Sequence, residues 1–301
     1  MAKKKGLIQG KKKTEKKAYL FILPQMVLLF VLVIIPVLYS LVLAFCDWDF
    51  VSGIDNIKFV GLDNFVSMWK DPKFIRSFVN TIVFVAGVVP VSMGLSLVIA
   101  IILNRNVYCK GLLRLGFFIP YISSIVAVSI VWSFIFNPTQ GPINEFLMKL
   151  GISNPPGWLT DSKWALVSLM IVSIWQALGY CIIIYLGGLQ NVPEDLYEAA
   201  KIDGASGLQQ FFRITIPMLS PTTFFLLITR IIQSFQIFAP IRVLTNGGPG
   251  YSTNVMVFYM YDNAFQYYKM GYASAVAWVM FAIIMVITVV QWRGQKKWVA
   301  Y

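Results

Sequence analysis

The sequence has 301 residues, of which 58% are hydrophobic and only 13% are charged. Soluble domains carry roughly 25% charged residues, so the composition excludes an ordinary soluble globular protein. Histidine, the commonest general base and metal ligand, is absent, and the three cysteines (Cys46, Cys109 and Cys181) have no disulfide or metal-ligand spacing. We therefore expect neither a catalytic site nor a metal site.

The apolar residues fall in long runs. About 20 consecutive apolar residues are needed to cross ~30 Å of hydrocarbon as a helix. The sequence therefore predicts an all-α, polytopic membrane protein with six transmembrane helices, near residues 19–45, 78–103, 115–136, 164–189, 218–244 and 270–292. Together these form one transmembrane domain over residues 19–292, with a basic tail at 1–18 and a second tail at 293–301. The external segment 137–163 is rich in Gly and Pro and is predicted to be a loop.

The positive charge predicts the orientation. If the N-terminal tail is cytoplasmic, sixteen Lys and Arg residues lie on the inner side and seven on the outer side, with Arg230 and Arg242 inside a span. This asymmetry is the positive-inside bias, and an even number of spans returns the C-terminus to the cytoplasm. We expect a multi-pass protein of the cell membrane with both termini cytoplasmic. The basic residues need no nucleic-acid partner, because they suit anionic lipid headgroups.

The segment 193–217 carries four acidic residues on the cytoplasmic side, where basic residues otherwise dominate. Pro193 followed by two carboxylates favours a helix start, and Gly204 permits a sharp change of direction. Ser206 with Gln209 fits a capping box that begins a second short helix, which Pro217 is expected to end. We interpret the segment as two short helices that form an exposed knob for another protein. The alternative is an ordinary inter-span loop with incidental helicity.

These residues carry a family resemblance. The series Glu198-Ala199-Ala200, Asp203-Gly204-Ala205 and Ile214–Pro217 resembles the EAA loop of type I ABC importer permeases. The resemblance covers nearly the whole chain and is closest to the carbohydrate-uptake branch, in particular to first permease subunits of maltose, multiple-sugar and glycerol-phosphate importers. Further matching positions are Gly61–Phe65, Asn80-Thr81, Phe118–Pro120, Gly141–Asn144 and Leu244–Pro249.

The resemblance implies a permease that moves a carbohydrate by alternating access and performs no chemistry itself. The implied partners are a second homologous permease, two ABC ATPase subunits, an extracytoplasmic solute-binding protein, the carbohydrate and membrane lipids, but no nucleic acid. ATP and Mg²⁺ would be bound by the ATPase, so no cofactor is expected here. The chain accordingly has no G-x-x-x-x-G-K-[ST] motif to cradle nucleotide phosphates. The resemblance assigns ATPase coupling to Glu198, Ala199, Ala200, Asp203, Gly204 and Ala205.

Polar residues inside two spans suggest the solute path, because transporter sites lie near the membrane midplane. They recur at helical spacing: Ser173, Gln176, Ala177 and Tyr180 on the fourth span, and Arg230, Gln233, Ser234 and Ile237 on the fifth. The resemblance places sugar-contacting positions at all of these except Gln176. The alternative is that the serines and glutamines join helices to one another.

Arg230 is the sharpest of these signals. An arginine at mid-span costs at least ~2.5 kcal/mol, so it should face water, solute or a partner. None of the six predicted spans contains Asp or Glu. One hypothesis is that Arg230 binds an anionic solute, such as an acidic oligosaccharide or a sugar phosphate. The rival is an acidic residue of the second permease.

Other classes of function remain as alternatives. A glycerol-phosphate or other sugar-phosphate importer would share the same architecture. An ion-coupled secondary transporter usually carries intramembrane carboxylates for the coupling ion, and the spans have none. The same lack, together with the absence of histidine, counts against a membrane-embedded enzyme.

Overall fold

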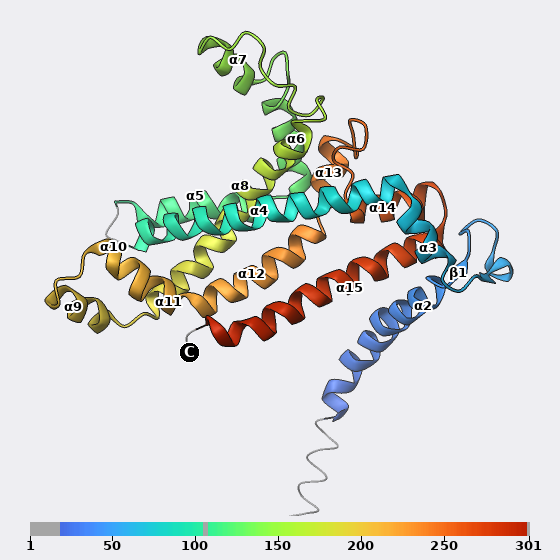
Figure 1. Cartoon of the computed structure of the whole chain (residues 1–301), viewed down its shortest axis with the longest axis horizontal. Helices are drawn as coiled ribbons and strands as arrows, with labels where there is room; N and C mark the ends of the chain where they lie inside the picture. The colour runs from blue at the N-terminus through green and yellow to red at the C-terminus, as the bar shows by residue number, and fades with distance from the viewer. Residues whose placement is uncertain (1–18, 105–107, 300–301) are drawn as a thin grey trace, which may run out of the picture. The chain divides into compact units, whose positions relative to one another are not determined.

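A computed structural model describes residues 19–104 and 108–299, apart from the side chains of Ile54 and Lys297. The basic tail 1–18 lies outside the described residues. Within them, five helices are long and apolar enough to cross a membrane, and a sixth candidate is a helix pair bent by 100°. The five are Tyr19–Leu43, α4 (Pro72–Asn104), α8 (Ala165–Gln190), the segment Ser220–Leu244 and α15 (Met270–Gly294) (Figure 1).

Shorter elements connect these helices. The first helix includes a π-helical turn, Phe30–Ile34, and continues as α2 (Ile35–Leu43). The connecting elements are α3 (Asp63–Lys70), α7 (Pro142–Lys149), α9 (Glu194–Ile202), α10 (Gly207–Gln210), a π-helical turn (Phe211–Thr215), α11 (Ile216–Met218), α14 (Met256–Tyr261), a second π-helical turn (Asp262–Gln266) and the 3₁₀ turns Ile54–Asn56 and Gln295–Lys297.

The chain divides into two compact units. The first contains residues 19–67 and 263–278. Its strands β1 (Cys46–Asp47) and β2 (Lys58–Phe59) pair antiparallel, and the amide of Asn64 donates to the carbonyls of Ala44 and Cys46 at 3.0 and 2.9 Å. Gly271 packs so closely on the Cys46 carbonyl that an added Cβ would lie 1.9 Å from the oxygen. This explains the small residue at the start of α15.

The second unit, residues 68–262 and 279–299, holds α4, α8 and α12 (Ser220–Phe235), which pack on one another. Its buried apolar side chains join these three helices, for example Leu103, Tyr185 and Leu226. Small residues on α4 and α8, such as Ser96, permit this close approach in a membrane, where packing rather than water exclusion drives helix association.

A segment before α14 is pinned to α4 by side-chain hydrogen bonds. Ser77 donates to the Asn254 side chain at 2.9 Å, and Asn80 donates to the Asn254 carbonyl at the same distance. The Met256 amide donates to the Thr81 hydroxyl, also at 2.9 Å. The pair Asn80-Thr81 therefore has a structural role in this chain.

The third predicted span, 115–136, is not one continuous helix. Helix α5 (Lys110–Ile122) and helix α6 (Ile125–Ile135) meet at a bend of 100°. Between them, Ser123 has an extended backbone with ψ of 150°, and Ser124 has a non-helical backbone with ψ of 122°. The sequence predicted one helix near 115–136, and the structure has two, because an unbroken apolar run does not reveal this change of direction.

The fifth predicted span is also interrupted. Helix α12 ends at Phe235, residues 236–238 are irregular, and α13 (Ala239–Leu244) continues the chain. Irregular backbone at membrane depth is tolerated where it is buried in protein or lines a cavity.

Two further expectations need correction. Segment 137–163 contains helix α7, which begins after Gly141 with Pro142 in its first turn. A Gly-Pro pair therefore starts a helix here. Pro217 does not end a helix, because it lies in the first turn of α11 after a π-helical turn.

Candidate functional site

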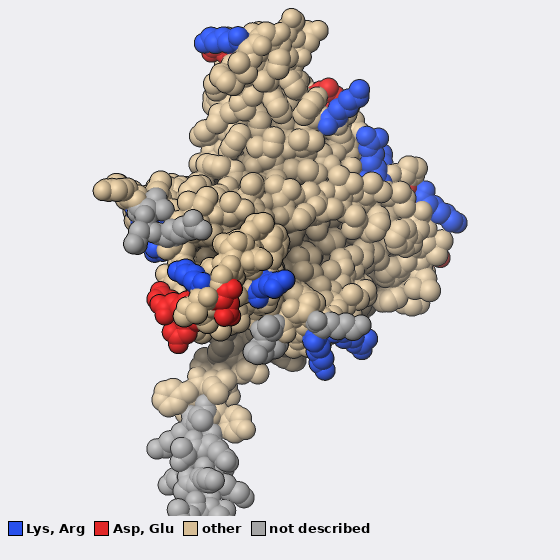
Figure 2. Space-filling model, turned by 60° about the vertical axis from the view of Figure 1, so that its left-hand side comes forward, with Lys and Arg blue, Asp and Glu red and all other residues tan. Residues whose placement is uncertain are grey.

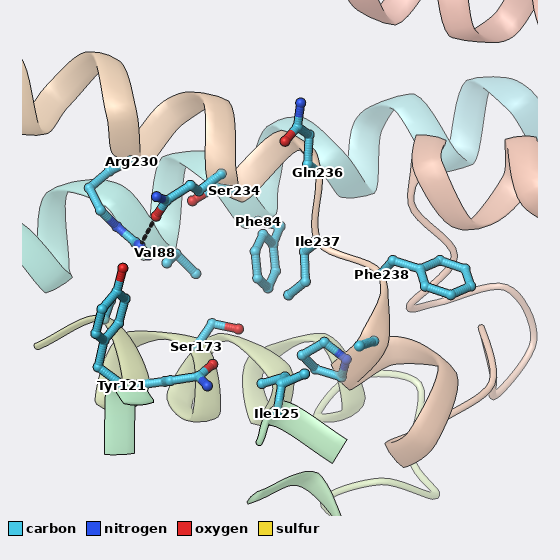
Figure 3. Close-up of a pocket in the computed structure, with 15 residues that line it drawn as sticks. Phe84, Val88, Tyr121, Ile125, Ser173, Arg230, Ser234, Gln236, Ile237 and Phe238 are labelled. Carbon is cyan, nitrogen blue, oxygen red and sulfur yellow. Dashed lines mark hydrogen bonds between the residues drawn. The ribbon is translucent and has the colours of Figure 1, made fainter. Parts of the chain in front are cut away.

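A cavity of about 430 Å³ lies in the second unit. Most of its wall comes from α8, α12 and the irregular residues after α12, with contributions from α4 and the two sides of the bend between α5 and α6 (Figure 3). The lining residues are Phe84, Val88, Tyr121, Ile125, Ser173, Gln176, Ala177, Arg230, Gln233, Ser234, Gln236, Ile237, Phe238, Ala239 and Pro240.

The cavity brings together seven of the eight residues predicted to form the solute path. On α8, Ser173, Gln176 and Ala177 follow the helical spacing that places side chains on one face. On α12 the same spacing aligns Arg230 with Gln233 and Ser234. Ile237 joins them from the irregular segment.

Tyr180 is the exception, since it does not line this cavity. Its ring stacks on Tyr121 with centroids 5.2 Å apart. Tyr121 does line the cavity, and in Figure 3 its hydroxyl points toward the side of Arg230. Tyr180 therefore supports the wall from behind.

Arg230 is 7% exposed and lies on the cavity wall. Its Nη1 donates to Oε1 of Gln233 at 2.6 Å, and its Nε is buried with no hydrogen-bond partner among the described residues. The titratable side chains that interact with it electrostatically are Cys181, Tyr121 and Tyr180, none of which is a carboxylate. The positive charge therefore has no negative counterpart within this chain's described spans.

Two hydroxyl groups, like Nε of Arg230, are buried without a hydrogen-bond partner among the described residues. They are the Oγ atoms of Ser173 and Ser234, two residues that line the cavity. Buried polar groups normally have hydrogen-bond partners. The cavity thus offers several unused donors beside apolar and aromatic side chains, which suits a solute with both hydroxyl groups and apolar ring faces.

Sequence reasoning missed the part of the wall formed at the two helix breaks. Tyr121 and Ile125 lie on either side of the α5–α6 bend, and Gln236, Phe238 and Ala239 follow α12. Pro120 and the Ser123-Ser124 pair were available as a signal for a break. These residues do not by themselves indicate the direction in which the chain turns.

The second candidate site is the coupling segment, residues 193–217. Helix α9 has no buried residue and ends at Ile202; Gly204, two residues later, has a φ of +77°. The amides of Gly204 and Ala205 donate to the carbonyls of Lys201 and Ala200 at 3.0 and 2.8 Å. This is the Schellman arrangement, in which a glycine allows the chain to leave a helix sharply.

The next helix begins with the expected capping box. Ser206 accepts from the Gln209 amide at 3.3 Å, and the Gln209 side chain accepts from the Ser206 amide at 2.7 Å. The hydroxyl groups of Tyr197 and Thr215 lie 2.9 Å apart and join the two sides of the segment. These contacts confirm the prediction of two short helices on either side of Gly204.

The surface of the coupling segment combines charge with exposed apolar side chains. Figure 2 shows acidic side chains gathered in one cluster, with lysine or arginine side chains beside it. The acidic residues of the segment are Glu194, Asp195, Glu198 and Asp203. Ile202, Leu208 and Phe212 are 87%, 69% and 61% exposed. Large exposed apolar side chains on an otherwise polar surface are typical of interaction sites.

The chain is similar to known transport proteins over nearly its whole length. The family described as "Binding-protein-dependent transport system inner membrane component" matches residues 73–293. The lactose transport system permease of Rhizobium radiobacter is 36% identical, with 93% of this chain and 94% of that protein covered. The sn-glycerol-3-phosphate transport system permease of Agrobacterium fabrum is 32% identical, with 94% and 96% covered.

A solved structure has the same fold. It is a bacterial alginate ABC transporter in complex with an alginate pentasaccharide-bound periplasmic protein; the matched chain is 24% identical, with 96% of each chain covered and a TM-score of 0.82. The apolar helices agree with a multi-pass membrane protein. The chain therefore belongs to the inner membrane components of binding-protein-dependent transport systems, and it is a permease subunit of an ABC importer.

Proposed function

We propose that this permease carries a carbohydrate through the cavity between α8 and α12. The observation that carries the proposal is the group of unpartnered polar atoms on Arg230, Ser173 and Ser234 beside an aromatic wall. Hydroxyl groups of a saccharide would hydrogen-bond to the polar face, and its rings would pack on the apolar face.

The coupling segment is proposed to transmit the work of ATP hydrolysis. Glu198, Ala199 and Asp203 are exposed there, close in sequence to the exposed Ile202. They would contact an ABC ATPase that binds ATP and Mg²⁺, so this chain needs no cofactor. Movement of that partner would displace α9, and the spans would alternate between inward-facing and outward-facing states.

The remaining partners follow the same proposal. A second homologous permease would complete the pathway, and an extracytoplasmic binding protein would deliver the solute. The coupling segment and both termini would face the cytoplasm, as the distribution of Lys and Arg predicts.

A second candidate is a sugar phosphate such as glycerol phosphate. Two observations favour it: the uncompensated charge of Arg230 and the likeness to a glycerol-3-phosphate permease. Guanidinium groups bind phosphate and carboxylate oxygens in the same forked geometry.

The test is uptake by proteoliposomes that contain the permease, its second permease, its ATPase and its binding protein. Radiolabelled lactose, digalacturonate and glycerol 3-phosphate are supplied outside, with or without ATP inside. We expect uptake of one solute that requires ATP and is stopped by vanadate. Uptake that ignores ATP but stops when ion gradients are collapsed would establish a secondary transporter instead.

A further inference from the structure

We propose that the cavity contains an anion-binding subsite, in which Arg230, Ser234 and the first turn of α6 bind a carboxylate or phosphate group of the solute. This inference rests on the proposed function and narrows the solute to an anionic one. It follows from three features of the cavity that are independent of one another.

The first feature is the state of the Arg230 guanidinium. Its neighbour Gln233 occupies Nη1 and fixes the plane of the group, but an amide oxygen carries no net charge. Nε stays buried and unbonded on a side chain that is only 7% exposed. A buried cation is tolerated when it is paired, and leaving it unpaired costs several kcal/mol. An anion on this side of the guanidinium would supply the missing charge and acceptor.

The second feature is the unused hydroxyl group of Ser234. Its Oγ is buried on a residue that is 4% exposed, and it lies four residues after Arg230, on the same face of α12. A hydroxyl group donates well to an oxyanion. Figure 3 shows Ser234 on the same helix as Arg230, at the edge of the cavity.

The third feature is the start of α6, which lies at the cavity because Ile125 is one of the lining residues. This 11-residue helix begins after the break at Ser123-Ser124, and no side chain caps its first turn. A helix start presents free N–H groups and about half a positive charge, so it attracts anions. Broken transmembrane helices of transporters place such ends toward anionic solute groups.

The geometry favours a solute over an acidic side chain of the second permease. Arg230 borders a cavity of about 430 Å³ that two serines with unbonded hydroxyl groups also line, Ser234 on the same helix and Ser173 on α8. One carboxylate from a partner would satisfy the guanidinium but would leave the serine donors and the α6 terminus unused. A solute with an anionic group and several hydroxyl groups satisfies all of them.

The subsite is tested by saturation-transfer NMR on the full-length permease with its co-purifying subunits in nanodiscs. The probes are two matched pairs: methyl galacturonate with methyl galactoside, and glycerol 3-phosphate with glycerol. We expect at least one anionic probe to bind about tenfold more tightly than its neutral counterpart, because a charge-assisted hydrogen bond is lost in the neutral one. The probe that binds distinguishes a carboxylate solute from a phosphate solute.

Two variants locate the binding at Arg230. Arg230→Gln should abolish the preference for the anion. Gln233→Glu should do the same without removing the arginine, because a carboxylate 2.6 Å from Nη1 would occupy the guanidinium. The matched control is Arg293→Gln, which removes an exposed cation from the last turn of α15 and should leave the preference intact.

Three results would overturn the subsite: no probe binding, equal binding within each pair, or a preference that survives in both variants. If the Arg230→Gln variant no longer co-purified with the second permease, while Gln233→Glu kept the preference for the anion, Arg230 would be assigned to the contact with that partner instead. ATP-driven uptake of neutral sugars alongside any of these results would leave the proposed transport function standing. Absence of ATP-driven uptake would refute the function itself.

Discussion

At the scale of single residues, Gly204 has a conformation that its neighbours do not share. Its φ of +77° costs other residues about 1–2 kcal/mol, although no atom lies within 4 Å of an added Cβ. Gly204→Ala should therefore strain the end of α9 without a steric clash. We expect a severalfold lower amount of solute transported per ATP hydrolysed, measured in proteoliposomes that contain the whole transporter.

The matched control is Gly207→Ala, three residues away. Gly207 also has open space around it but no positive φ, and alanine favours the helix that it begins. This control should keep its transport-to-hydrolysis ratio. Equal losses in the two variants would show that bulk, rather than backbone conformation, limits this segment.

The sequence predicted seven of the residues that line the cavity because helical spacing is a strong constraint. Arg230, Gln233 and Ser234 had to share a face of α12 once that segment was helical. Gln233 as the hydrogen-bond partner of Arg230 was not predicted, since side-chain contacts depend on rotamers. Tyr180 was placed in the path by spacing, but its ring turns to stack on Tyr121.

At the scale of elements, the contact between α5 and α8 depends on Gly179. A Cβ at this position would lie 2.3 Å from the Phe117 carbonyl oxygen, which belongs to the α5 backbone. Gly179→Ala should push the two helices apart at a cost of roughly 1–3 kcal/mol. We expect a thermal-unfolding midpoint about 5 °C lower than in the wild type. The midpoint is measured by fluorescence-detected size-exclusion chromatography of the purified complex.

Gly187, on the same helix, provides the control. No atom lies within 4 Å of a Cβ there, so Gly187→Ala should leave the midpoint unchanged or raise it slightly. If both alanine variants unfolded at the wild-type temperature, the close approach of α5 to α8 would be wrong.

The existence of the apolar helices could be read from hydropathy, but their interruptions could not. The run through Ser123 and Ser124 is long enough for one span, yet the chain turns by 100° there. Hydropathy measures transfer to lipid and has no term for direction. Segment 193–217 was better determined because glycine, capping and acidic signals all lie within it. α7 was missed because the same Gly-Pro pair suits a loop or a helix start.

At the scale of the whole molecule, the distribution of charge predicts the orientation of the chain in the membrane, and this orientation can be measured directly. Of the three cysteines, Cys46 and Cys181 are buried, whereas Cys109 is exposed between α4 and α5. The positive-inside bias places this connection on the cytoplasmic side. A membrane-impermeant maleimide should therefore label Cys109 in inverted vesicles and not in intact cells.

The opposite side is reported by Ser153→Cys in a Cys109→Ser background, because Ser153 is exposed in the segment between α7 and α8. This variant should be labelled in intact cells, while the parent without Ser153→Cys supplies the background signal. The two positions are separated by the bent pair α5–α6, so opposite labelling also requires that the pair crosses the membrane once. Labelling of both cysteines from the same side would mean that α5 and α6 form a re-entrant loop, and the predicted orientation of every later helix would reverse.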